Sequence, residues 1–342
     1  MYEPRHIPAS HRLSAWLLSA LFALSLCVQQ AWAAPAERTV IPLGQAVGIK
    51  LFADGVLVVA LADGPTPARA CGLRQGDIIT AMDGAAVGST EQVQDLLANT
   101  AGAPIVLSVR RGADALALTA CARENNGVWQ LGAWIRDSMA GIGTLTYYDP
   151  ATGQYGALGH GITDVDTAQL MPLASGAIME TTVKAVKKGA KGDPGELKGD
   201  FDLTRDSGTL YANTECGIFG KLSAEDAAKI TGAALPIAKK DEVKTGKATI
   251  LATVSGNETR EYDIEIEKIY SPSGSTRNLL LRVTDKELLA QTGGVVQGMS
   301  GSAILQDGKI IGAITHVLLD DPSRGYGIFI ENMLSAAGLS SE

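Results

Sequence analysis

The sequence predicts a small α+β domain followed by a larger, mainly-β domain. Three observations lead to this fold class. Short β-rich runs surround two helical segments in residues 37–123, strand-like runs separated by turn residues recur after residue 145, and helical patterns are scarce in that second part. The chain has 342 residues, of which 46% are hydrophobic, so it holds enough apolar material for two domain cores.

We expect the first 33 residues to lie outside the fold, as a signal peptide or an N-terminal anchor. Arg5 and Arg12 give a positive start, residues 13–28 carry no charge, and Ala31-Trp32-Ala33 places small residues where signal peptidase cleaves. An uncleaved anchor is the alternative, although the apolar run is short for a membrane span of about 20 residues. The pattern therefore predicts export across a membrane.

The composition narrows the classes of partner and cofactor. With 29 Lys and Arg against 37 Asp and Glu, the chain has a formal net charge of −8, which disfavours nucleic acid because phosphate binding requires a basic surface. Beyond the signal segment lie Cys71, Cys121 and Cys216, without any Cys-x-x-Cys or Cys/His cluster. We therefore expect no metal and no cofactor, and we favour three buried thiols over a Cys71–Cys121 disulfide.

Residues 37–123 have the pattern of one small domain. A β-rich run at 55–61 precedes a short helix that ends at Gly72 and a tight turn at 82–84. A second helix is predicted over 89–99, because a serine can cap its start and its apolar residues recur on one face.

The stretch AxxCGLRQGDIITAMDG, which begins at Ala68, resembles the PDZ domains attached to bacterial proteases. Such domains capture an extended peptide by adding it to the edge of a sheet, and backbone N–H groups hold its terminal carboxylate. By this resemblance, the loop before Gly48 would bind the carboxylate, and the peptide-binding candidates are Val47, Gly48 and Ile49. The alternative is a small α+β domain whose glycines serve only its turns.

Residues 124–342 form the second predicted domain, and their first part, 124–145, is expected to be a connector whose Trp129 and Trp134 dock onto a core. Strand-like runs then recur at 181–186, 208–213, 247–254, 261–269, 278–284, 302–305 and 310–315. Many short strands with glycine-rich turns favour a barrel or a sandwich. Residues 187–200 are rich in Lys, Gly and Asp and are predicted to be an exposed, mobile loop.

Ser300 is the candidate nucleophile. It lies in Gly298-Met299-Ser300-Gly301, where glycines on both sides allow a tight loop and close approach of a substrate. Acyl transfer needs backbone N–H groups that stabilise the developing oxyanion, and Gly298 and Ser300 would supply them. Gly-Xaa-Ser-Gly alone is a weak motif for a catalytic serine and is often only a turn. The elements that follow it therefore decide whether it indicates a nucleophile.

A serine nucleophile needs a base, and two histidines follow the signal segment. His160 is favoured, because it ends a β-rich run and is flanked by glycines. His316 follows the nucleophile hairpin, where it would border the substrate cleft or fill space.

The residues alone do not decide which carboxylate would be the acid of a triad. Asp285 precedes Ser300 by fifteen residues, and Asp164 and Asp166 follow His160. Each of these carboxylates could instead cap a helix or lie on the surface, and Asp285 in particular could cap a short helix.

The order of elements after Ser300 resembles the catalytic half of chymotrypsin-like proteases, in which nucleophile loop, hairpin, return strand and closing helix follow one another. The resemblance implies a mainly-β, double-barrel peptidase domain after the PDZ-like domain. The candidates for lining its substrate cleft are Gly294, Val295, Gln297, Thr315 and His316. If the pocket is built as in trypsin-like proteins, its base carries no acid, so selection of Lys or Arg is not expected.

Three longer stretches are similar to the signature blocks of the stage IV sporulation protein B peptidases: YGALGHGITDVD, RVTDKELLAQTGGVVQGMSGSAI and GAITHVLLDDPSRGYGIFIENML. In that family the block histidine, the aspartate of TD and the serine of GMSGS form the triad. The resemblance therefore implies His160, Asp285 and Ser300 here. Ala303 departs from the proline that is usual after GMSGS.

The resemblance implies an exported serine endopeptidase of sporulation signalling, which acts close to a membrane in the space between the forespore and mother-cell membranes. It implies a membrane-bound regulator of a processing protease as substrate, cleavage of the protein by itself, and a part for the PDZ module in recognition. The main alternative is a non-catalytic PDZ scaffold with an inactive protease-like domain. An α/β-hydrolase is disfavoured, because a β-hairpin and not a long helix follows Ser300.

Overall fold

The computed structural model describes residues 38–270 and 276–339. The predicted signal segment, residues 1–33, lies outside the described residues. Within the described ranges, the helices are all too short or too polar to cross a membrane.

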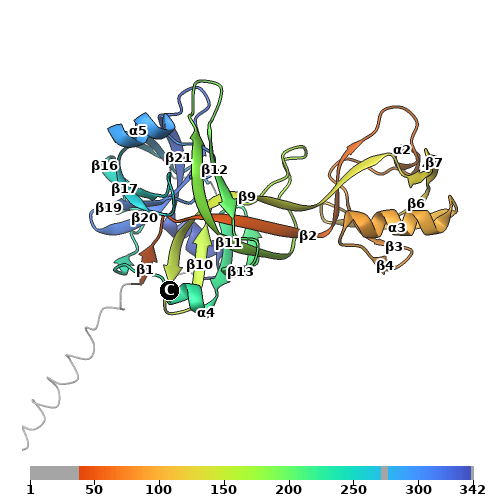
Figure 1. Cartoon of the computed structure of the whole chain (residues 1–342), viewed down its shortest axis with the longest axis horizontal. Helices are drawn as coiled ribbons and strands as arrows, with labels where there is room; N and C mark the ends of the chain where they lie inside the picture. Colours follow the sequence, from red (N-terminus) through yellow and green to blue (C-terminus); the bar gives the residue numbers. More distant parts are fainter. Residues whose placement is uncertain (1–37, 271–275, 340–342) are drawn as a thin grey trace, which may run out of the picture. The chain divides into compact units, whose positions relative to one another are not determined.

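Strands dominate the described chain, and the helices are short (Figure 1). The elements of the first part are β1 (Thr39–Pro42), β2 (Ala46–Leu61), α2 (Pro67–Cys71), β3 (Ile78–Met82), β4 (Ala85–Ala86), α3 (Thr90–Thr100), β5 (Pro104–Arg111), β6 (Asp114–Cys121), β7 (Arg123–Asn125), β8 (Val128–Gln130) and β9 (Ala133–Asp149). Those of the middle part are β10 (Gln154–Ala157), β11 (Leu173–Lys187), β12 (Glu196–Phe201), β13 (Gly208–Thr214), β14 (Gly217–Leu222), α4 (Ala224–Ala227) and β15 (Leu235–Pro236). The last part contains β16 (Gly246–Ala252), β17 (Arg260–Ile269), β18 (Leu279–Val283), α5 (Lys286–Thr292), β19 (Ala303–Gln306), β20 (Lys309–Val317), β21 (Arg324–Phe329) and α6 (Ile330–Ala336).

A first barrel closes from strands that lie far apart in the sequence. β2 pairs with β9, and the ring continues through β10, β14, β13 and β11 back to β2. Side chains such as Tyr155, Ile178 and Ile218 fill its interior. β1 adds to β9 outside this ring, and β15 adds to β1. Closure satisfies the backbone groups that an open sheet would leave at its edges.

A second barrel closes from β16, β17, β18, β21, β20 and β19, in that order around the ring. Its strands alternate between buried and exposed side chains, as in β17, where Tyr262, Ile264 and Ile266 point inward. α6 follows β21 and buries Met333. The two barrels confirm the prediction of a mainly-β, double-barrel domain.

The first barrel is interrupted by a PDZ-like module, here called the inserted module (residues 56–136). The second half of β2 pairs with β3, and the sheet continues through β5 to β6. On its other side, the second half of β2 pairs with Ala133–Arg136, the beginning of β9. Figure 1 shows β2 and β9 running side by side. These two strands therefore belong both to the module and to the barrel.

Helix α3 packs on the sheet of the inserted module. Ser89 caps it by accepting a hydrogen bond from the Gln92 N–H at 3.2 Å, and its buried residues are Val93 and Leu97. The structure confirms the α+β character of the module and the helix predicted over 89–99.

Val47, Gly48 and Ile49 lie in the first barrel and not in the inserted module. Gly48 pairs with Ile142 of β9 on one side and with Met179 of β11 on the other. Because strands flank it on both sides, this segment has no edge that could receive a peptide. The prediction that these three residues bind a peptide is wrong.

The beginning of the domain predicted over 37–123 also belongs to the barrel, because β1 and the first half of β2 pair there. The predicted connector, 124–145, forms β7, β8 and most of β9. Trp129 packs against Gly102, but Trp134 is 66% exposed and does not dock onto a core.

The segment 187–200, predicted to be an exposed, mobile loop, is not a loop throughout, because β12 begins at Glu196. β12 pairs with β11 in a hairpin whose register runs from Thr181–Phe201 to Lys187–Glu196. The Lys- and Gly-rich composition belongs to the turn of that hairpin, where the Gly189 N–H donates to Thr292 O at 2.8 Å.

Cys71, Cys121 and Cys216 are free thiols in the described chain. Cys121 is exposed and the other two are partly buried, so the expectation of three buried thiols is wrong. Cys71 and Cys121 line one surface pocket at α2 and β6.

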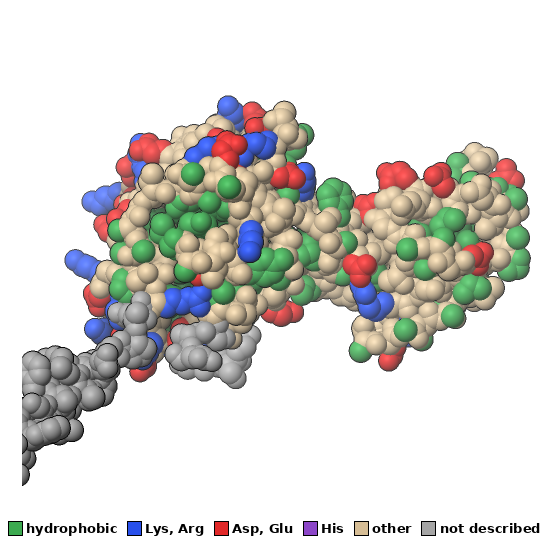
Figure 2. Space-filling view, turned by 90° about the horizontal axis from the view of Figure 1, so that it is seen from below, with side chains coloured by type: hydrophobic (Ala, Val, Ile, Leu, Met, Phe, Trp, Pro, Cys, Tyr) green, Lys and Arg blue, Asp and Glu red, His purple; other side chains and the backbone are tan. Residues whose placement is uncertain are grey.

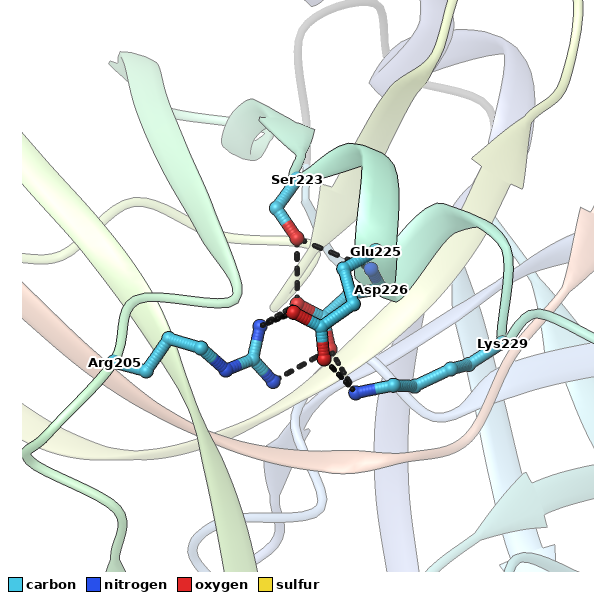
Figure 3. Close-up of polar contacts among 5 residues, drawn as sticks. All are labelled: Arg205, Ser223, Glu225, Asp226 and Lys229. Atoms are coloured by element: carbon cyan, nitrogen blue, oxygen red, sulfur yellow. Dashed lines mark hydrogen bonds and ion pairs between the residues drawn. The ribbon is translucent and has the colours of Figure 1, made fainter.

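Ion pairs and hydrogen bonds hold the short helix α4 in place. In Figure 3, the guanidinium of Arg205 binds the carboxylate of Asp226 in α4, while the Ser223 hydroxyl donates to the same carboxylate at 2.6 Å. Lys229 approaches it at 3.2 Å. Arg205 is the main cause that holds the pKa of Asp226 below its ordinary value. On the face drawn in Figure 2, Lys and Arg side chains of the barrels lie among Asp and Glu side chains.

Candidate active site

Ser300 lies in the loop that joins α5 to β19, in the second barrel. Gly298 and Gly301 on either side of it have φ values of +97° and +100°, which L side chains rarely adopt. A Cβ at Gly301 would lie 2.0 Å from the carbonyl oxygen of Thr144 in β9. The backbone conformation and the close approach to the first barrel both require glycine here.

The backbone amides beside Ser300 are available to an oxyanion. The N–H of Met299, between them, donates to Val296 O at 3.1 Å. Within the residues that the structure describes, the N–H groups of Gly298 and Ser300 donate no hydrogen bond. Two unengaged donors next to a serine hydroxyl are what an oxyanion hole requires.

His160 follows β10 on a strained turn. Leu158 and Gly159 have φ values of +67° and +68°, and a left-handed conformation is unfavourable for a leucine. A Cβ at Gly159 would lie 2.9 Å from a methyl group of Thr315 and 3.0 Å from one of Ile328. The turn therefore brings the histidine of the first barrel against β20 and β21 of the second.

His160 and Ser300 line the same two cavities, although no hydrogen bond joins them. His160 Nδ1 lies 2.9 Å from the Gly161 carbonyl oxygen, so Nδ1–H donates to it and Nε2 remains as the basic atom. Ser300 Oγ donates to Thr315 O at 2.7 Å. The serine hydroxyl has to turn away from Thr315 before His160 can take its proton.

Burial sets the protonation of the two histidines. It lowers the pKa of His160 below its ordinary value, against the effect of the Gly161 carbonyl. The ring centroids of His160 and His316 are 5.1 Å apart. Burial, together with the charges of His160 and Arg277, lowers the pKa of His316 to about 4. Both imidazoles are therefore neutral near pH 7, and His160 can act as a base.

The structure does not bring Asp285 to His160. Asp285 is the N-cap of α5, and its Oδ1 accepts a hydrogen bond from the Leu288 N–H at 2.8 Å. It lines neither of the cavities shared by His160 and Ser300. The sequence left open whether this carboxylate caps a helix or serves as the acid of a triad, and the structure shows the cap. The Gly161 carbonyl, and not a carboxylate, orients the imidazole of His160.

Asp164 and Asp166 are also engaged elsewhere. Asp164 is fully buried and forms an ion pair with Arg136, and Asp166 binds the same guanidinium at 3.0 Å. The other oxygen of Asp164 accepts hydrogen bonds from the N–H and the hydroxyl of Thr167 at 2.9 and 3.0 Å. These carboxylates fix the loop that follows His160.

A cavity of about 630 Å³ opens beside Ser300. Its walls contain the predicted cleft residues Val295, Gln297, Thr315 and His316. Gly294 does not line it, since a Cβ there would lie 2.0 Å from Pro322 O.

The same cavity carries few charges. Arg277 lies over the ring of Tyr326, 5.4 Å from its centroid, and Asp320 is the only carboxylate among the described lining residues. Asp320 is exposed, at the rim. An apolar side chain therefore fits this cavity better than a lysine or an arginine.

A second groove, which sequence reasoning missed, lies in the inserted module. A cavity of about 370 Å³ separates α3 from the segment Gln130–Ile135 at the start of β9. The Gly132 carbonyl accepts a hydrogen bond from the Ala62 N–H, next to the end of β2. The backbone N–H and C=O groups of successive residues in a strand point alternately to its two sides. The N–H and carbonyl of Ala133 therefore point away from β2.

The edge of β9 at Ala133–Ile135 is thus open to an added strand. In the described chain, the N–H groups of Leu131 and Gly132 donate no hydrogen bond, so two donors adjoin this edge. The apolar run Ala133-Trp134-Ile135, within the predicted connector, was the available signal for a strand here.

Among the described residues, no group of three or more His, Cys, Asp or Glu side chains could hold a metal ion.

The sequence profile of the PDZ domain matches residues 59–111, within the inserted module. No curated protein matches the chain significantly.

Solved structures resemble the two parts of the chain. The PDZ domain of the SdrC-like protein from Listeria monocytogenes is 25% identical, over 24% of this chain and 87% of that one, with a TM-score of 0.22. The active form of the Rv3671c protease from M. tuberculosis is 14% identical, over 59% of this chain and 73% of that one, with a TM-score of 0.32. Its inactive form is 14% identical, over 58% and 85%, with a TM-score of 0.33.

The profile of the SpoIVB peptidase S55 family matches residues 127–334, which is more than half of the chain. This range contains His160, Ser300 and all of the second barrel. The chain therefore belongs to the SpoIVB peptidase S55 family of serine peptidases.

Proposed function

We propose that this chain is an exported serine endopeptidase in which Ser300 is the nucleophile and His160 the general base. One observation carries the proposal: His160 and Ser300 border the same cavities, next to the unengaged amides of Gly298 and Ser300. A base, a nucleophile and an oxyanion site are the groups that peptide hydrolysis requires.

The reaction begins when the Ser300 hydroxyl turns from Thr315 O to Nε2 of His160. His160 takes the proton as Oγ attacks the peptide carbonyl, and the amides of Gly298 and Ser300 stabilise the oxyanion. The imidazolium then protonates the leaving amine, and a water molecule hydrolyses the acyl-enzyme by the reverse sequence. The Gly161 carbonyl keeps the proton on Nδ1 throughout.

The substrate is an extended segment of a protein. We propose the membrane-bound regulator of a processing protease as the substrate, and cleavage of the chain by itself as a second reaction. This proposal is supported by membership of the SpoIVB peptidase S55 family and by the signal pattern at residues 1–33. The site of action would be the space between the forespore and mother-cell membranes, with the inserted module contributing to recognition.

The test compares the full chain with its Ser300→Ala variant. We expect wild-type protein to react with a serine-directed fluorophosphonate and to cleave itself, and Ser300→Ala to do neither. Ser302→Ala is the matched control, because the Ser302 hydroxyl is buried without a hydrogen-bond partner in the described chain. If the wild-type chain is not labelled, or if Ser300→Ala is labelled equally, the chain is a PDZ scaffold and not a peptidase.

A further inference from the structure

A smaller cavity of about 280 Å³, here called the β9 pocket, also borders Ser300 and His160. The cavity of about 630 Å³ is bordered by β20 of the second barrel, from Thr315 onward. The β9 pocket is bordered instead by residues 139–142 of β9, in the first barrel, and by residues 160–163 after β10. The two cavities therefore reach the nucleophile along different strands, one from each barrel.

The walls of the β9 pocket are mainly apolar. Five aliphatic side chains line it: Ile49, Met139, Ile142, Leu158 and Ile162. In the part of the chain that the structure describes, no Asp, Glu, Lys or Arg side chain contributes to the lining. A cavity of this size and lining suits one aliphatic or aromatic side chain, whose transfer from water is favourable, and disfavours a charged one.

Gly141 of β9 keeps the β9 pocket open. A Cβ at this position would have no heavy atom within 4 Å beyond its chain neighbours. Two residues further, on the same face of the strand, a Cβ at Gly143 would lie 2.3 Å from Leu158 Cδ2 and 2.6 Å from Ile49 Cδ1. Among the glycines of the described chain, Gly141 alone combines a φ outside the left-handed region with empty space around a Cβ. The backbone does not require glycine here, so its effect is the volume that a side chain would fill.

The edge of β9 beside this pocket is free. The Leu145 N–H donates to Gln45 O at 3.0 Å, so the backbone groups of Leu145 point to β2. The register with β2 continues without a shift from Thr144 back to Ser138, and the direction of the backbone groups alternates along a strand. The N–H and C=O groups of Ala140 and Ile142 therefore point away from β2, and within the described ranges no hydrogen bond engages them.

The same edge leads to the nucleophile. Thr144, the next residue in this alternation, donates its N–H to Ser300 O at 3.0 Å and its hydroxyl to Gly298 O at 2.7 Å. An extended peptide that passes Ser300 can therefore continue as an added strand on Ile142 and Ala140, with one side chain in the β9 pocket.

The half of the substrate that leaves with the amine lies against the His160 loop (residues 158–171). His160 protonates this amine, and residues 161–163 of the loop line the β9 pocket but not the cavity of about 630 Å³. The larger cavity lies between the nucleophile loop and β20, where trypsin-like proteins bind the side chain that precedes the scissile bond. The side chain that follows the bond is therefore the one that enters the β9 pocket.

We propose that the β9 pocket selects an apolar residue directly after the scissile bond, and that Gly141 is the residue that sets this specificity. This inference rests on the proposed peptidase function and adds to it the class of substrate. Because the larger cavity also suits an apolar side chain, the substrate is a protein segment that is apolar on both sides of the cut.

The first experiment incubates the full chain with a peptide library prepared from whole-cell protein, and mass spectrometry identifies the residues on both sides of each cut. In wild type, Leu, Ile, Val, Met or Phe should follow the cut about 10-fold more often than Asp, Glu or Lys. Gly141→Leu should reduce this ratio to within about twofold, because its side chain fills the β9 pocket. The residue before the cut is the internal reference, since the other cavity binds it.

The second measurement compares two reactions of Ser300 in the same variant. A fluorophosphonate loses only fluoride, whereas a peptide places a chain in the β9 pocket. Gly141→Leu should therefore lower the ratio of the peptide cleavage rate to the labelling rate by about 30-fold. Gly88→Leu is the matched control, because Gly88 of the inserted module also has a φ outside the left-handed region, and a Cβ there would meet only Gln92 Oε1, at 4.0 Å.

If Gly141→Leu does not fold by circular dichroism, Gly141→Ala decides. Its single methyl group should exclude Phe before Val, so that the ratio of Phe to Val after the cut falls by about threefold or more. A wild type without selection after the cut, or the same selection in wild type and in the folded variant, overturns the inference and leaves the peptidase intact. So does a wild type that is labelled but cleaves no library peptide. A wild type that is neither labelled nor active removes the proposed function itself.

Discussion

In the second barrel the strands follow one another along the chain from β16 to β21, whereas the first barrel is interrupted between β2 and β9 by the inserted module. Ser300 belongs to the uninterrupted barrel, and His160 to the interrupted one. The module contacts the side of the base through Arg136 and Gln75. The nucleophile loop is shaped mainly by its own glycines, whereas the position of the base depends on pairing between distant segments.

This difference gives the two halves of the site different roles. The Ser300 loop has a backbone that its glycine φ values define, and Thr144 of β9 holds it through hydrogen bonds to Gly298 O and Ser300 O. The His160 loop combines a left-handed leucine with ion pairs from another domain, so its conformation is the more adjustable of the two. Regulation is therefore expected to act on the base, and variants in each barrel can test this.

The largest effect should come from comparing the two histidines. His160→Ala removes the base that borders Ser300, and we expect the rate of substrate cleavage to fall by about 10,000-fold. His316→Ala, in the second barrel, should stay within about tenfold of wild type, because His316 lines the cavity without a hydrogen bond from its Nδ1 in the described chain. Equal losses in both variants, measured as kcat/KM on a peptide substrate, would contradict the assignment of His160 as the base.

The next effect compares the cores. Ile178→Ala in the first barrel and Ile314→Ala in the second each remove a fully buried side chain, and each should lower the free energy of unfolding by about 2–5 kcal/mol. One apolar cluster contains Tyr147 and Phe219 of the first barrel together with Ala313 of the second. We therefore expect a single urea transition in both variants. Two separate transitions, followed by fluorescence and by circular dichroism, would mean that the barrels unfold independently.

The second barrel could be predicted from the sequence because its signals are local. β17 alternates, and Asp307-Gly308 marks the turn between β19 and β20. The first barrel could not, since β2 finds its partners in β9 and β11, far along the chain. Gly55, with a φ of +101°, looked like a boundary but lies inside one long strand that passes from barrel to module.

The site was predictable in its residue types and less so in its geometry. Glycines around Ser300 and a scarcity of histidines pointed to the nucleophile and the base. The role of Asp285 could not be decided, because an aspartate before a helical segment has the same local pattern whether it caps that helix or faces an imidazole. The groove at Ala133–Ile135 needed the knowledge that β9 pairs with β2.

Asp285 offers a smaller test of the same comparison, because it caps α5, the helix that precedes the nucleophile loop. Asparagine caps helices as well as aspartate does, so Asp285→Asn should keep both stability and cleavage rate near wild type. Asp285→Ala should cost about 1 kcal/mol in the free energy of unfolding and loosen the segment before Ser300. A loss of about 1,000-fold in kcat/KM for Asp285→Asn would instead assign the carboxylate to a triad.

The smallest expected effect is the contribution of buried His316 to the pH dependence of the free energy of unfolding. Burial lowers the pKa of His316 to about 4, whereas an unfolded histidine titrates near 6.5. Between those values the unfolded chain binds a proton that the folded chain does not, so the free energy of unfolding decreases as the pH falls. Replacing His316 by Asn should reduce this slope by at most about 1.4 kcal/mol per pH unit, the limit for one proton.

The measurement is urea unfolding of wild type and His316→Asn from pH 7 to pH 4, and the quantity of interest is the difference between the two curves. Taking the difference cancels the titration of carboxylates common to both proteins, including Asp226. If the free energy of unfolding of wild type minus that of His316→Asn decreases steadily as the pH falls, His316 is neutral and buried beside His160. A difference that is constant over the whole range would mean that His316 takes up its proton as readily in the folded chain as in the unfolded one, and the second barrel would then place a charge next to the base.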